Sequence, residues 1–114
     1  MSILQWFRKA KQVKAKTYEN TDQWAAQHFP DSQRDIARRV ADILIEQVGV
    51  DLDGLTPMTR FIEDLRMTDL EPVEVVMALE VDFGLTIPGA DFEPLETITD
   101  LVQYLYERVQ HTTA

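Results

Sequence analysis

Three segments of the chain place apolar residues at helical spacing, and this pattern limits the possible folds more than any other feature. The first predicted helix, residues 33–48, follows Ser32 as its N-cap and ends at Gly49. The last predicted helix begins after Thr97 and runs to about Val109. No segment alternates apolar and polar residues convincingly enough to predict a strand, so the sequence indicates an all-α domain.

The second predicted helix, residues 70–83, differs from the others because its apolar residues occupy two sides. At a turn of about 100° per residue the two stripes lie roughly 150° apart. A minimal bundle buries only one of them, so we expect the stripe bordered by acidic residues to face a partner. In the alternative, the loop 50–68 or the N-terminal segment covers it. The core stripe is Val75, Val76, Leu79 and Phe83, and the second stripe is Leu70, Val73, Met77 and Val81.

Charge is divided unevenly along the chain. The net charge is -9, yet residues 1–18 hold five basic residues and no acidic one, whereas residues 19–114 hold six basic and twenty acidic residues. Phosphate backbones repel a body this acidic, so nucleic acid is a poor partner and a basic protein surface is a better one.

The charge boundary also suggests how the chain is organised. Residues 1–18 are predicted to form a basic amphipathic helix, 19–31 a linker with a short turn, 32–110 the helical domain and 111–114 a tail. Two interpretations of the N-terminal helix stay open: contact with an anionic membrane, or packing on the acidic domain of its own or a neighbouring chain. The residues assigned to this surface are Ile3, Trp6, Phe7, Arg8, Lys9 and Lys11.

The residue inventory argues against catalysis and metal binding. The chain has no cysteine, which removes disulfides, thiolate ligands and thiol nucleophiles, and its two histidines, His28 and His111, lie in different segments. A calcium loop starting at Asp51 would need glycine at its sixth position and glutamate at its twelfth, where Thr56 and Ile62 stand. We therefore expect neither an enzyme nor a metal site.

Three stretches of sequence carry a resemblance to a known family. They are Phe-Ile-Glu-Asp-Leu at 61–65, the run Leu70–Glu80, and Phe83 with Ile87-Pro88. With these residues the chain resembles the acyl carrier protein family from about residue 36 to 109. The resemblance implies a four-helix bundle with a long first loop and a short third helix. It also implies a phosphopantetheine arm on the serine of an Asp-Ser-Leu motif that opens the second helix.

The chain departs from the family at that motif, because it reads Thr68-Asp69-Leu70 and Asp69 stands where the family has serine. A carboxylate lacks the alcohol oxygen that the attachment requires, so we expect no phosphopantetheine. Asp69 still suits the N-cap position of the helix. Thr68 offers a hydroxyl one residue early and is an alternative attachment point. Arg66 stands where the family usually has glycine.

The sequence therefore predicts a docking module of the acyl-carrier type without an arm, which binds and regulates or recruits acyl-handling enzymes that have a basic docking surface. One alternative is a functional carrier that uses Thr68 in fatty-acid or polyketide synthesis. Another is an interaction protein tethered to a membrane surface through residues 1–18. We expect a cytoplasmic location, peripheral at the inner membrane in the last case. By resemblance, the partner-binding residues are Leu70, Val73, Glu74, Met77 and Glu80.

Overall fold

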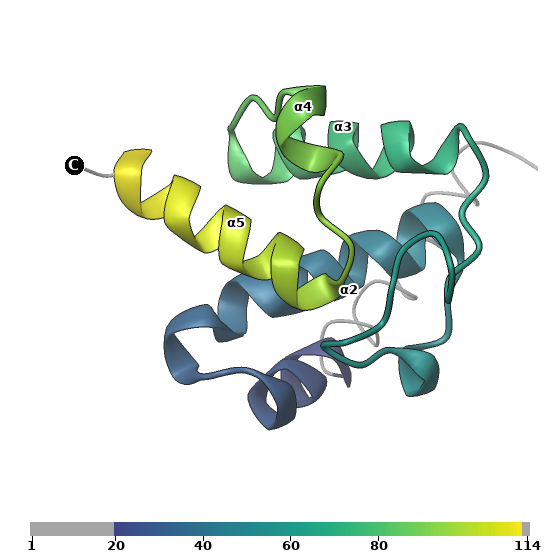
Figure 1. The fold of residues 1–114 in the computed structure, drawn as a ribbon. Helices are drawn as coiled ribbons and strands as arrows, with labels where there is room; N and C mark the ends of the chain where they lie inside the picture. The colour runs from purple at the N-terminus through teal and green to yellow at the C-terminus, as the bar shows by residue number, and fades with distance from the viewer. Residues whose placement is uncertain (1–19, 113–114) are drawn as a thin grey trace, which may run out of the picture.

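The computed structural model describes residues 20–112, which fold into packed helices joined by a long connection between the second and third (Figure 1). In the described part of the chain there is no strand, only an isolated bridge between Arg60 and Thr97. The expected all-α bundle is confirmed. After a helix at residues 20–28, the elements are η1 (Asp31–Gln33), α2 (Arg34–Val48), η2 (Leu52–Gly54), α3 (Glu71–Phe83), α4 (Gly89–Phe92) and α5 (Ile98–Thr112).

The core lies where α2, α3 and α5 meet. Each helix contributes side chains that are fully removed from solvent, and burying each large one stabilises the fold by about 1.5–3 kcal/mol. The periodic stripes predicted for the first and last helices supply most of them. The largest fully buried apolar side chains are Leu44, Leu79, Ile98, Leu101, Leu105, Val40, Val75 and Val102.

Helix α2 occupies nearly the predicted range, and Gly49 ends it in the left-handed conformation with φ of 77°. The expected cap at Ser32 is wrong. The short 3-10 turn Asp31–Gln33 precedes the helix, and Gln33 at the N-cap position makes no side-chain capping bond. Because Pro30 already begins this turn, its carbonyl accepts the amide of Gln33 and Ser32 lies inside the turn.

A helix at residues 20–28 replaces much of the linker expected at 19–31. The linker interpretation is wrong for these residues, because one side of the helix is buried in the core. The indole of Trp24 donates a buried hydrogen bond of 2.8 Å to the carbonyl of Leu55. The spacing of the buried residues is helical, but threonine and alanine give weak apolar signals. The buried residues are Thr21, Trp24, Ala25 and Phe29.

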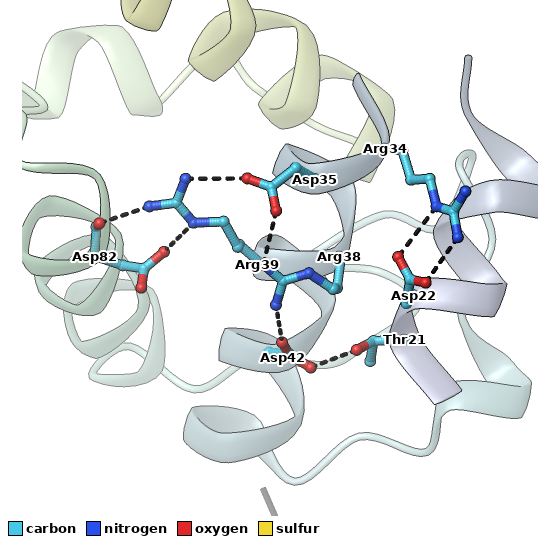
Figure 2. Close-up of polar contacts among 8 residues, drawn as sticks. All are labelled: Thr21, Asp22, Arg34, Asp35, Arg38, Arg39, Asp42 and Asp82. Atoms are coloured by element: carbon cyan, nitrogen blue, oxygen red, sulfur yellow. Dashed lines mark hydrogen bonds and ion pairs between the residues drawn. The ribbon is translucent and has the colours of Figure 1, made fainter. Parts of the chain in front are cut away.

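Polar contacts tie this helix to α2 (Figure 2). The hydroxyl of Thr21 donates to the carboxylate of Asp42 at 2.6 Å. The guanidinium of Arg34 binds both oxygens of Asp22, at 3.1 and 2.7 Å. These hydrogen bonds from Arg34 hold the pKa of Asp22 below its ordinary value.

The long connection between α2 and α3 is fastened to the start of α5. The amide of Phe61 donates to the carbonyl of Glu96 at 3.0 Å, and the amide of Ile98 donates to the carbonyl of Thr59 at 3.1 Å. Residues 61–65 form a turn within this connection. The connection is therefore a built part of the domain that leads the chain to the start of α3.

Helix α5 begins with a capping box formed by Thr97 and Asp100. The hydroxyl of Thr97 accepts from the amide of Asp100 at 3.2 Å, while the carboxylate of Asp100 accepts from the amides of Thr97 and Glu96, both at 3.1 Å. Both halves of the box are formed, so these backbone N–H groups at the start of α5 have hydrogen-bond acceptors.

Candidate functional site

The candidate site begins with the turn that leads into α3. Leu70, not Asp69, is the N-cap residue, and no side chain makes a capping hydrogen bond there. The expected cap at Asp69 is therefore wrong. A carboxylate capping from Asp69 would accept the backbone N–H of residue 71 or residue 72. Residue 72 is proline, which has no N–H, so only Glu71 could donate. Asp69 is exposed instead.

The segment before α3 has an unusual backbone. Arg66 has φ of 53°, a left-handed conformation that the other described non-glycine residues avoid and that glycine adopts without a steric cost. This is the position where the resemblance leads us to expect glycine. The amide of Thr68 then donates to the carboxylate of Glu71 at 2.9 Å, which fixes the turn entering the helix.

The outer side of α3 is an exposed apolar strip. Val75 and Leu79 face the core with no exposed surface, whereas every member of the second stripe remains in contact with solvent. Within the described residues neither the loop 50–68 nor any other segment covers this strip. The exposed fractions are 63% for Leu70, 52% for Val73, 60% for Met77 and 85% for Val81.

The two acidic residues assigned to this surface have different surroundings. Both Glu74 and Glu80 are half-buried on α3. The carboxylate of Glu80 accepts the amide of Ile87 at 2.8 Å and so holds the connection that follows α3. Glu80 thus has a structural contact that the sequence did not indicate.

A shallow groove that no local sequence pattern indicates lies beside the strip. It has a volume of about 460 Å³ and lies between α2 and α3. Its two walls come from different helices that are more than twenty residues apart in sequence. The groove therefore exists only because these helices pack side by side. Its lining residues are Ile43, Glu46, Gln47, Glu74, Met77, Ala78, Val81 and Asp82.

At one end of the groove Arg39 joins α2 to α3 (Figure 2). Its guanidinium donates to the carboxylate of Asp82 at 2.7 Å and to the carbonyl of the same residue at 2.6 Å. The guanidinium also lies 3.9 Å from the ring centre of Phe83. These contacts place a cation at the negative end of α3 and hold the two walls together.

The N-terminal residues assigned to membrane contact or self-docking, Ile3 to Lys11, lie outside the described residues. Over the described range no helix is long and apolar enough to cross a membrane. The same range contains no cluster of three His, Asp or Glu side chains arranged to hold a metal ion.

The resemblance implies a phosphopantetheine arm, which needs a side-chain alcohol oxygen at the start of α3 for its attachment. Asp69 offers carboxylate oxygens, whose attack on a pyrophosphate would give a labile mixed anhydride in place of a stable phosphodiester. Thr68 has a hydroxyl, but it lies one residue before the expected position, and its amide is bound to Glu71. Asp69 therefore does not fit covalent attachment of this group.

Comparisons with known proteins agree with this architecture. A family model described as a phosphopantetheine attachment site matches residues 38–105, which include Asp69. The chain is 44% identical to the acyl carrier protein of Bdellovibrio bacteriovorus over 70 residues, which are 61% of this chain and 90% of that protein. It is 39% identical to the acyl carrier protein of Akkermansia muciniphila over 79 residues, which are 69% of this chain and 98% of that protein. It is 37% identical to the acyl carrier protein of Rickettsia canadensis over 73 residues, which are 64% of this chain and 85% of that protein. The chain belongs to the acyl carrier protein family.

Proposed function

We propose that this chain is an acyl-carrier-like docking module that carries no phosphopantetheine and acts by binding acyl-handling enzymes. The observation that carries the proposal is the exposed apolar strip of α3, which begins directly after Asp69. Members of the family are carriers rather than catalysts, and we propose no catalytic role for this chain. Its working location would be the cytoplasm, where such enzymes are found.

The chemistry of the strip defines the partner that fits it. Leu70, Val73 and Met77 offer apolar contact area, and Glu74 adds negative charge beside them. A partner with an apolar groove inside a basic rim would bury the strip and pair with the acid. Binding without delivering an acyl group would let the chain recruit such an enzyme or hold it inactive.

A binding experiment with matched variants tests the docking proposal. Purified enzymes of fatty-acid and polyketide synthesis are titrated against the full chain, and the dissociation constant is measured for Met77→Ala and Glu74→Lys. We expect each change to weaken binding about tenfold, as for a central interface residue. Equal binding by the native chain and both variants would remove α3 as the docking surface.

Two control variants keep this test specific. Met58→Ala removes a methionine that is 70% exposed in the long connection, and Glu93→Lys reverses an exposed charge at the end of α4. Both should leave the dissociation constant within about twofold of the native value, because surface changes away from an interface contribute little. Weakening by Glu93→Lys as well would indicate a general charge effect, and weakening by Met58→Ala would show that the loss of binding is not specific to α3.

A further inference from the structure

The groove between α2 and α3 combines an apolar floor with acidic walls. Met77 and Val81 of α3 expose apolar surface to it, and Ile43 of α2 lines its other side. Glu46 and Glu74 place carboxylates on opposite walls. An occupant that satisfies both features has an apolar face flanked by basic side chains.

Residues 1–18 of the same chain have this composition. Their apolar residues recur at helical spacing, and they hold five of the chain's eleven basic residues with no acid among them. The remaining chain, which includes the groove, holds all twenty acidic residues. The segment and the groove are thus complementary in charge and in apolar character.

The chain also enters the described fold close to the groove. The hydroxyl of Thr21 donates to the carboxylate of Asp42 of α2 at 2.6 Å, so the first described residues of the chain lie beside this position. Asp42 lies four residues before Glu46, which is about one helical turn or ~6 Å along α2. Eighteen residues in a helix extend about 27 Å, and the thirteen residues of α3 about 20 Å. The segment is therefore long enough to reach and follow the groove.

We propose that residues 1–18 dock in the groove between α2 and α3 of their own chain. In this position they cover Glu74, Met77 and Val81, which are part of the surface offered to a partner. A partner must then displace the segment, so the segment competes with docking and lowers the apparent affinity. The self-docking rests on the groove and the segment alone, whereas the competition rests on the proposed function.

The experiment uses the full chain and its few methionines. Because the chain has no cysteine, Gln12→Cys introduces a single site for a spin label on the polar side of the predicted helix. Labelling with ¹³C-methyl methionine gives four signals, of which Met77 lies in the groove and Met58 in the long connection. We expect the Met77 methyl signal to broaden strongly and the Met58 signal to change little. Equal broadening of both signals, or none at Met77, would overturn the proposal.

A second variant and a mixed sample distinguish the other occupants. Lys9→Glu with Lys11→Glu should restore the Met77 signal without altering the buried Met67 signal, which reports on the fold. Broadening that persists when spin-labelled chains are mixed with separate ¹³C-labelled chains would assign the groove to a second copy and overturn docking within one chain. An unbroadened Met77 signal, with the segment bound to vesicles of anionic lipid, would assign the segment to a membrane instead.

The same charge reversal tests the competition. If the segment is docked about nine-tenths of the time, releasing it from the groove by the charge reversal should lower the dissociation constant for the enzyme about tenfold. Unchanged enzyme binding together with a restored Met77 signal would contradict the competition alone. No Met77 broadening, with enzyme binding still sensitive to Met77→Ala, would contradict self-docking and leave the proposed function intact.

Discussion

Helices α3 and α5 both place apolar residues at helical spacing, but α3 has a second apolar stripe and the surroundings of the two helices differ. In α5 the stripe of Ile98, Leu101, Val102 and Leu105 is fully buried, and the first turn is closed by a complete capping box. In α3 one stripe remains exposed, and the helix starts without a side-chain cap. Helix α5 is therefore stabilised by its buried stripe and its cap, whereas the start and outer side of α3 have fewer stabilising contacts. This difference is expected for a helix whose outer side binds a partner.

The largest test of this comparison replaces one leucine in each helix. Leu105→Ala should lower the free energy of unfolding by about 2–5 kcal/mol, because it leaves a cavity in the core. Leu70→Ala, at a position 63% exposed, should change it by less than about 0.5 kcal/mol. Urea denaturation measures both. Comparable losses would mean that the α3 strip is covered in the folded chain.

The two helix starts provide a smaller test. Thr97→Ala removes the hydroxyl that accepts the amide of Asp100, so it should lower the free energy of unfolding by about 1 kcal/mol. Thr68→Ala keeps the amide that donates to Glu71 and should change stability by less than about 0.5 kcal/mol. Thermal denaturation of the two variants side by side gives the comparison. A larger loss for Thr68→Ala would show a cap at the start of α3 after all.

The backbone before α3 allows a stabilising change. Arg66→Gly should raise the free energy of unfolding by up to about 1 kcal/mol, because glycine adopts a φ of 53° without steric cost. Arg66→Ala keeps the strained conformation and serves as the control, with an expected change of a few tenths of a kcal/mol. Chemical denaturation measures the free energy of unfolding of both variants. A destabilised Arg66→Gly variant would contradict backbone strain at Arg66.

The smallest expected effect depends on pH and concerns the contact between Asp22 and Arg34. Because the hydrogen bonds from Arg34 lower the pKa of Asp22 in the fold, this contact stabilises the protein above the unfolded pKa of about 4. The contribution is lost as the pH falls through the lower folded pKa. Asp22→Asn should therefore be slightly less stable than the native chain at pH 7, with the difference shrinking below about pH 4. Asp69→Asn at the start of α3 is the matched control. A stability difference between Asp22→Asn and the native chain that grows as the pH falls would contradict the lowered pKa of Asp22.

Much of the fold follows from periodicity and glycine. The apolar spacing predicted α2, α3 and α5, and Gly49 ends α2 as expected. Gly84 ends α3 in the same left-handed conformation. The exposed strip on α3 was also predictable, because two apolar stripes on one helix cannot both enter a small core.

Other features depend on contacts that the sequence does not reveal. The helix at 20–28 was missed because its buried side includes Thr21 and Ala25, whose apolar signals are weak. The cap at Asp69 failed because Pro72 removes an amide that such a cap would bond. The groove required knowledge of how two helices pack, which local sequence patterns do not contain.

Intact mass spectrometry shows directly whether the chain carries the phosphopantetheine arm. The native chain and Asp69→Ser are each incubated with coenzyme A and a phosphopantetheinyl transferase. We expect no mass gain for the native chain and the gain of one phosphopantetheine for Asp69→Ser, because serine restores the alcohol at the family's position. A phosphopantetheine on the native chain, at Thr68 or elsewhere, would make the chain a working carrier and rule out a docking module without an arm.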